Sequence, residues 1–107
     1  YGDHRDLHSS LHDALPICHV TTNETISGAQ MKALPETGSP LIADMSSDIL
    51  SRPIDYTQCA MIYAGAQKNM GPSGVALVAI RKDLAAKGSI SLPTMLRYQT
   101  QIDENSL

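Results

Sequence analysis

The chain has 107 residues, of which 42% are hydrophobic and 18% are charged, and its formal net charge is -3. This composition is typical of a single folded domain and excludes an intrinsically disordered segment. The acidic balance argues against a nucleic-acid partner, because no basic stripe can neutralise phosphates. No apolar run reaches the roughly 18 residues that a membrane-spanning helix needs, so we expect no membrane partner either.

The chain contains two cysteines, Cys18 and Cys59. Two widely separated cysteines are too few for a disulfide framework or a zinc site. We therefore interpret both as reduced thiols and expect a cytoplasmic protein. Cys59 and the nearby Met61 are expected to fill the hydrophobic core.

Residues 1–17 do not share the apolar pattern of the rest of the chain. They contain His4, His8 and His12, which would share one face of a helix and could be mistaken for a metal site. The segment lacks the periodicity of a packed element and resembles a translated sequencing adapter. We therefore interpret it as a non-native or flexible extension, expect no metal site, and take residues 18–107 as the domain.

Two strands are predicted in the first half of this domain. Residues 18–26 are rich in β-branched side chains and favour a strand. Residues 27–40 contain Gly, Pro and Ser and favour a loop. Residues 40–48 form a short apolar run that stops at an acid and two serines, which is typical of a buried strand. Residues 49–60 are predicted to be a connection, because Pro53 fixes its own φ and disfavours helix before it.

The second half begins with another apolar strand at residues 60–66. Residues 74–88 are predicted to form a strand that leads into a short helix, with Asp83 near its start and Lys87 at its close. Residues 89–107 show weak periodicity and are expected to trail off. Short buried strands with few helices between them indicate an incomplete α/β fold.

Polar residues stand at the ends of the predicted strands: Thr25, Asp44 and Lys68. The carboxyl ends of strands in an α/β sheet converge on one crevice. There, a partly buried lysine can form a Schiff base with an aldehyde, and a carboxylate in an apolar strand needs a cationic partner. Pyridoxal phosphate offers both an aldehyde and a protonated ring nitrogen. A Lys68–Asp44 salt bridge in a plain α/β domain would give the same pattern, so both interpretations remain open.

Four motifs, in order, carry a resemblance to a known family: "NETISG", "ADMSSDILSRPID", "IYAGAQKNMGPSGVALVAIRKDL" and "PTMLRY". Together they resemble the phosphoserine aminotransferases, a family of class V aminotransferases among the fold-type I, pyridoxal-phosphate-dependent enzymes. The resemblance runs from about His19 to Leu107. It implies the central part of the family's large, cofactor-binding domain, which is an α/β domain with a mixed, mostly parallel sheet.

The resemblance also implies roles for four residues. Lys68 of "AGAQKN" falls on the family's Schiff-base lysine, and Asp44 of "ADMSSD" falls on the acid that pairs with the pyridinium nitrogen. These two would be the catalytic residues. Thr25 falls on the hydroxyl that contacts the phenolic oxygen of the cofactor, and Gln67 falls on the glutamine that contacts its phosphate. The expected cofactor is therefore pyridoxal 5'-phosphate.

Members of this family transfer an amino group between glutamate and 3-phosphohydroxypyruvate, giving O-phosphoserine and 2-oxoglutarate, and the complete protein is expected to be a homodimer. The resemblance implies that the cofactor-phosphate turn, a ring-stacking aromatic residue, an Asn-Thr pair and the substrate-binding arginines lie outside this sequence. We therefore expect the chain alone to be inactive. Another class V enzyme, such as a serine–glyoxylate aminotransferase or a cysteine desulfurase, and a non-catalytic α/β fragment remain alternatives.

Structural roles are expected for several polar residues near the proposed site. Arg52 of "SRPID" is expected to fix a turn by donating to backbone carbonyls or to Asp55. His19 is expected to be a core histidine with a hydrogen-bond partner. Ser46 and Ser47 follow the candidate acid and could bond to it or to the backbone, and we leave them outside the predicted site.

Overall fold

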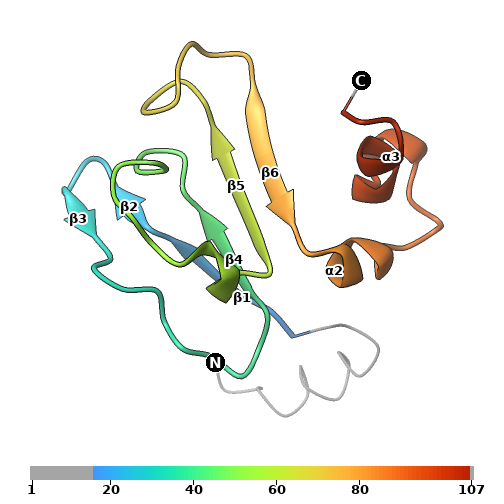
Figure 1. Cartoon of the computed structure of the whole chain (residues 1–107), viewed down its shortest axis with the longest axis horizontal. Coiled ribbons are helices and arrows are strands. Elements are labelled where there is room, and N and C mark those ends of the chain that lie inside the picture. Colours follow the sequence, from blue (N-terminus) through green and yellow to red (C-terminus); the bar gives the residue numbers. More distant parts are fainter. Residues whose placement is uncertain (1–15, 107) are drawn as a thin grey trace.

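A computed structural model describes residues 16–106 of the chain (Figure 1). Four strands form one sheet in the order β1-β4-β5-β6. Strand β4 is parallel to both β1 and β5, and β6 runs antiparallel to β5. The predicted α/β class with a mixed, mostly parallel sheet is therefore confirmed. The strands span Cys18–Thr21 (β1), Leu41–Asp44 (β4), Met61–Gly65 (β5) and Ala76–Ile80 (β6).

Smaller elements connect and flank this sheet. Strands β2 and β3 pair antiparallel as a short hairpin directly after β1. Helices α2 and α3 follow β6 and lie beyond it in Figure 1. These elements are β2 (Asn23–Glu24), β3 (Ala29–Gln30), the 3-10 helix η1 (Tyr56–Gln58), α2 (Lys82–Ala86), the 3-10 helix η2 (Thr94–Leu96) and α3 (Tyr98–Asp103).

The predicted elements agree with the structure in the centre of the chain and differ at both sides of it. The strands expected within residues 40–48 and 60–66, and the strand and helix within 74–88, are present. The predicted single strand over 18–26 is wrong, because the chain turns after β1 into the hairpin. Residues 89–107, expected to trail off, contain η2 and α3. Along residues 16–106, no helix has the length and apolar character needed to cross a bilayer.

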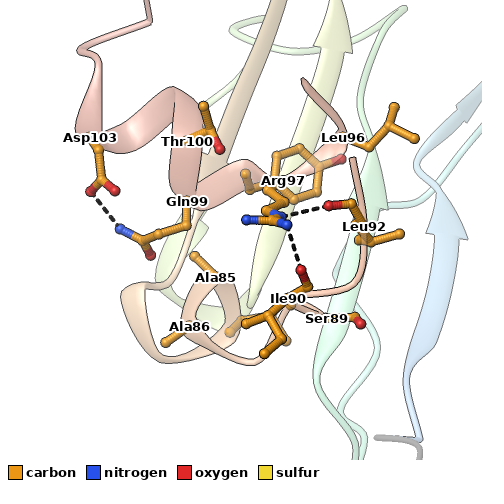
Figure 2. A pocket seen from close by; sticks show the side chains of 13 residues that line it. Ala85, Ala86, Ser89, Ile90, Leu92, Leu96, Arg97, Gln99, Thr100 and Asp103 are labelled. Atoms are coloured by element: carbon orange, nitrogen blue, oxygen red, sulfur yellow. Dashed lines mark hydrogen bonds between the residues drawn. The ribbon is translucent and has the colours of Figure 1, made fainter. Parts of the chain in front are cut away.

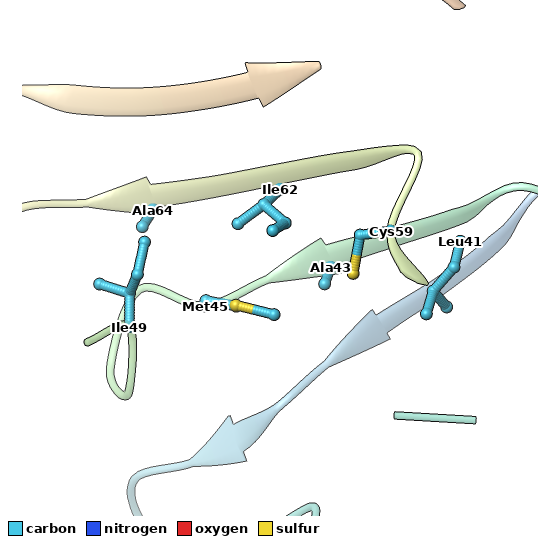
Figure 3. Packing of buried hydrophobic residues seen from close by; sticks show 7 residues of the cluster. All are labelled: Leu41, Ala43, Met45, Ile49, Cys59, Ile62 and Ala64. Carbon is cyan, nitrogen blue, oxygen red and sulfur yellow. The ribbon is translucent and has the colours of Figure 1, made fainter. Parts of the chain in front are cut away.

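The core lies on one face of the sheet (Figure 3). Side chains alternate along β4, so that Leu41 and Ala43 are buried while the residues between them are half-buried. Met45 continues this alternation and is the largest side chain that is fully buried in the described residues. The buried cluster consists of Leu41, Ala43, Met45, Ile49, Cys59, Ile62 and Ala64.

The opposite face of the sheet carries polar side chains. The strand register places Asp44 beside Thr21 of β1 and Tyr63 of β5. The same register places His19, which is two residues before Thr21 in β1, beside Ile42. These five residues are exposed or only half-buried in the described part of the chain. A ligand can therefore reach Asp44 from this face.

Residues 1–15, which hold most of the segment predicted to be a non-native extension, lie outside the described residues. His4, His8 and His12 are among them. Within residues 16–106, no three potential metal-ligating side chains lie together.

Candidate functional site

The candidate residues lie where three neighbouring parallel strands end. Thr25 follows β1 in the hairpin, Asp44 is the last residue of β4, and Lys68 follows β5 by a few residues. Because β1, β4 and β5 are adjacent and point the same way, their carboxyl ends meet at one end of the sheet, on the side of the β2–β3 hairpin (Figure 1). The topology thus brings polar groups from three distant segments to one place.

Lys68 and Thr25 are in direct contact. The Lys68 Nζ donates a hydrogen bond to Thr25 Oγ1 at 3.0 Å, although the two residues are 43 positions apart. Lys68 is exposed, so the expectation of a partly buried lysine is wrong in the described chain. Lys68 lies in a turn formed by residues 66–70, which keeps its side chain clear of the core. Asn69 anchors this turn by donating a hydrogen bond to the carbonyl of Ile49 at 2.6 Å.

The hairpin that presents Thr25 is fixed by Glu24. Its carboxylate accepts hydrogen bonds from the backbone N–H of Ser27 at 2.7 Å and of Ile26 at 3.1 Å. The Ser27 side chain, followed by the backbone N–H groups of Ser27 and Ile26, lowers the pKa of Glu24, and the charge of Lys68 lowers it slightly further. Gly28 closes the turn with a φ of 74°, which favours glycine. Thr25 is therefore held at the tip of a defined turn.

Asp44 is oriented by Ser46. The Ser46 N–H and Ser46 Oγ both donate to Asp44 Oδ1, at 3.0 and 2.7 Å. Ser46 Oγ in turn accepts from the backbone N–H of Gly65 at 3.1 Å. The ends of β4 and β5 are therefore joined through one hydroxyl. The sequence offered "DMSS" as a signal, because a serine two residues after an aspartate can bond back to it.

Gln67 folds back over the end of β5. A side-chain Cβ built at Gly65 would overlap the Gln67 amide oxygen and would lie 3.2 Å from its Cδ. The missing side chain at Gly65 therefore leaves the space in which the Gln67 amide lies. Gln67 itself is exposed, so its amide is available to a ligand at this end of the sheet.

Tyr63 and His19 form a second polar group on the face of the sheet that carries Asp44. The Tyr63 hydroxyl and His19 Nε2 share a hydrogen bond of 2.8 Å, and their ring centroids are 5.8 Å apart. Burial and the neighbouring Asp44 charge raise the pKa of Tyr63, so its hydroxyl keeps its proton. The prediction that His19 is a core histidine is wrong, because it lies on the face opposite the core cluster and is exposed.

Two other predictions of structural roles are confirmed. Arg52 donates to the backbone carbonyls of Lys32, at 2.7 Å, and of Met31, and so ties two loops together. Cys59 and Met61 are both buried. Burial also raises the pKa of the Cys59 thiol.

A Lys68–Asp44 ion pair, which would have favoured a non-catalytic salt bridge, is absent from the described residues. The ion pair found within residues 16–106 joins Arg81 to Asp83 at 3.1 Å, on the exposed start of α2. Lys68 instead contacts a hydroxyl, and Asp44 contacts a serine.

A hollow of about 420 Å³ lies elsewhere, between α2 and α3 (Figure 2). It is lined by residues of α2, of α3 and of the segment between them, and no candidate site residue lines it. Arg97 lies in this hollow, but its guanidinium already donates to the carbonyls of Leu92, at 2.7 Å, and Ile90. The arginine therefore holds the 90–97 segment in its turn.

The chain matches a known protein family over most of its length. The sequence pattern of the family described as Aminotransferase class-V matches residues 2–99 of the chain. The chain belongs to the class V aminotransferases. The matched range includes all four candidate site residues. It confirms the family resemblance drawn from the sequence motifs.

Among its relatives, this class V aminotransferase chain is 61% identical over 98 residues to the phosphoserine aminotransferase of Niallia circulans. That match covers 91% of this chain and 27% of the relative. A second relative, the phosphoserine aminotransferase of Lysinibacillus sphaericus, is 61% identical over 90 residues, covering 83% of this chain and 25% of the relative. The chain thus spans about a quarter of the length of these curated relatives.

Solved structures show the same fold. The phosphoserine aminotransferase from Bacillus circulans subsp. alkalophilus matches with a TM-score of 0.79 and 63% identity, over 82% of this chain and 25% of that one. The pyridoxal-phosphate-bound phosphoserine aminotransferase from Trichomonas vaginalis matches with a TM-score of 0.79 and 38% identity, over 85% of this chain and 27% of that one. The class V aminotransferase chain therefore has the fold of one part of these larger enzymes.

Proposed function

We propose that this chain is part of the pyridoxal-phosphate-binding domain of a phosphoserine aminotransferase, which transfers an amino group between glutamate and 3-phosphohydroxypyruvate. The observation that carries the proposal is the 3.0 Å hydrogen bond between Lys68 Nζ and Thr25 Oγ1 at the carboxyl ends of the parallel strands that also present Asp44. The names of the relatives at 61% identity support the choice of substrates.

The chemistry of the donor set fits pyridoxal phosphate. Lys68 supplies a primary amine for an aldehyde, and Asp44 supplies a carboxylate for a ring nitrogen. Thr25 supplies a hydroxyl beside the amine, where it can donate to a phenolic oxygen. The exposed amide of Gln67 can donate to a phosphate oxygen. A polar ligand with these four features meets a complementary group at each of them.

When bound, pyridoxal phosphate supplies an aldehyde that condenses with amines and a ring that accepts electrons. Lys68 can move, because it is exposed and its amine is held by one hydroxyl. In its unprotonated form, Lys68 Nζ acts as the general base that takes a proton from the α-carbon of the amino-acid substrate. Thr25 sets the resting position of that amine.

Asp44 acts as a fixed negative charge. Its carboxylate holds a proton on the pyridine nitrogen, since an ionised acid stabilises the cationic form of a partner at hydrogen-bond distance. Ser46 occupies one of its oxygens, Oδ1, with two hydrogen bonds. The other oxygen, Oδ2, would be the one that accepts from the ring nitrogen. The proposal includes a homodimer for the complete protein, as the sequence resemblance implies.

The experiment that tests this function uses a hybrid enzyme, in which residues 18–107 of this chain replace the matching segment of the Niallia circulans relative. With pyridoxal phosphate and glutamate, the hybrid should convert 3-phosphohydroxypyruvate to phosphoserine. Lys68→Ala should abolish turnover, while Lys82→Ala, which removes an exposed lysine of α2, should leave it unchanged. Turnover by the Lys68→Ala hybrid would refute the proposal. A preference of the unmutated hybrid for unphosphorylated keto acids would refute it as well.

A further inference from the structure

Ser46 makes contacts to which neither the sequence motifs nor the family resemblance gives a function. Its hydroxyl donates to Asp44 Oδ1 at 2.7 Å, and its backbone N–H donates to the same oxygen at 3.0 Å. Its hydroxyl also accepts from the backbone N–H of Gly65 at 3.1 Å. The residue is half-buried, so water competes less for these bonds than it would at an exposed position.

The bonds to Asp44 fix its side chain. A carboxylate at the end of a strand can rotate about two torsions, and two donors on one oxygen hold it in a single orientation. Hydrogen bonds to an ionised group are roughly twice as strong as those between neutral groups. Ser46 therefore determines the direction in which the second oxygen of Asp44 points.

The bond from Gly65 couples this orientation to the Lys68 loop. The backbone ladder between β4 and β5 ends where the N–H of Met45 donates to the carbonyl of Tyr63 at 2.9 Å. The next amide of β5 that faces β4 belongs to Gly65, and it donates to the Ser46 hydroxyl instead of a backbone carbonyl. The serine side chain thus extends the pairing of the strands by one bond, directly before the turn that carries Lys68.

We propose that Ser46 is a positioning residue of the transamination site, which fixes the Asp44 carboxylate and ties it to the end of β5 that carries Gln67 and Lys68. This inference rests on the proposed function for its catalytic consequence. The structural part, one hydroxyl shared by Asp44 and the Gly65 amide, can be tested without it.

Ser47 provides a matched control. It is the next residue and is also half-buried. Its hydroxyl makes two hydrogen bonds, both with Asn23. It accepts from the side-chain amide of Asn23 at 2.9 Å and donates to the backbone carbonyl of Asn23 at 3.0 Å. Ser47→Ala therefore removes the same chemical group and a similar number of bonds without touching Asp44 or Gly65.

The first test is amide hydrogen–deuterium exchange of the cofactor-free hybrid enzyme, measured by mass spectrometry with fragmentation that resolves Gly65. Ser46→Ala should speed exchange of the Gly65 amide by about tenfold, which is the loss of one hydrogen bond. Ser46→Thr keeps the hydroxyl and should restore protection, and Ser47→Ala should leave it unchanged. If Ser46→Ala does not fold, Ser46→Cys, with a weak donor of similar size, replaces it. Unchanged exchange at Gly65 would overturn the inference.

The second test is steady-state kinetics of the same hybrids with pyridoxal phosphate. Ser46→Ala should lower kcat by about tenfold, a typical effect of removing a group that orients a functional residue, with KM for glutamate unchanged. Ser46→Thr should restore kcat. An unchanged kcat in a Ser46→Ala hybrid whose Lys68 still binds the cofactor would refute the positioning role. A hybrid with no cofactor on Lys68 would refute the proposed function, while the exchange result would still decide the structural part.

Discussion

Replacing Gly65 with alanine should weaken cofactor binding while leaving the free energy of unfolding nearly unchanged. Gly65 does not have the positive φ that Gly28 and Gly74 have, so its backbone accepts alanine without strain. The new methyl group would overlap the Gln67 amide oxygen and lie 3.2 Å from the Gln67 Cδ. Because Gln67 is exposed, its side chain can rotate away from the methyl group.

The expected magnitudes follow from this geometry. The rotation costs little, and an alanine restricts the unfolded chain more than a glycine does, so the free energy of unfolding should stay within about 1 kcal/mol of the wild-type value. The proposed hydrogen bond from the displaced Gln67 amide to the cofactor phosphate would be lost. A bond to a charged group contributes about 1.5–3 kcal/mol, so the cofactor Kd should rise about 10- to 100-fold.

The assay is cofactor titration of the hybrid enzyme, followed by the absorbance of bound pyridoxal phosphate, together with urea unfolding of the cofactor-free form. Gln67→Ala should weaken binding by the same factor, and the double variant should be no weaker than either single variant, because both remove one interaction. Gly71→Ala is the control, since a Cβ at Gly71 would meet open space.

Two results would refute this reasoning. Wild-type affinity in Gly65→Ala would show that the Gln67 amide does not reach the cofactor. Additive losses in the double variant would show that the two substitutions act on separate interactions.

Three further predictions concern the core and the polar face. Met45→Ala should lower the free energy of unfolding by about 2–5 kcal/mol in urea titrations, because Met45 is fully buried. Asp44→Asn should lower the raised pKa of Tyr63 toward its usual value of about 10, measured by alkaline absorbance titration. In the wild type, the stability that neutral Tyr63 contributes is fully present below a pH of about 10. It is lost as the pH rises through the raised pKa of the folded state. Cys59, which is buried and has a raised pKa, should react with iodoacetamide more slowly than the half-exposed Cys18, and unfolding should remove the difference in a peptide map.

The central strands could be predicted from the sequence because they are buried on at least one side. Strands β4 and β5 are short apolar runs bounded by polar or glycine-rich residues, a pattern that is typical of buried strands. Strands β2 and β3 have two residues each and no alternation, so no periodic signal marks them. Helix α3 has six residues, and its apolar pair Tyr98 and Ile102 is too short a pattern to indicate a helix.

The sequence indicated that the candidate residues follow strand ends, but it did not indicate the contacts that they make. The motifs around Asp44 and Lys68 predict the roles that are proposed for these residues. The bond between Lys68 and Thr25 depends on a hairpin that the sequence does not indicate. The role of Ser46 depends on the Gly65 amide, which comes 19 residues later and becomes its neighbour when β4 pairs with β5.

The most direct test of the proposed function is the location of the covalent cofactor link. The hybrid enzyme loaded with pyridoxal phosphate should be reduced with borohydride, digested and analysed by mass spectrometry. We expect a reduced adduct on Lys68, and its loss in Lys68→Ala. An adduct on Lys82, on Lys87 or on any other lysine, or no adduct at all, would contradict the assignment of Lys68 and, with it, the role proposed for Asp44.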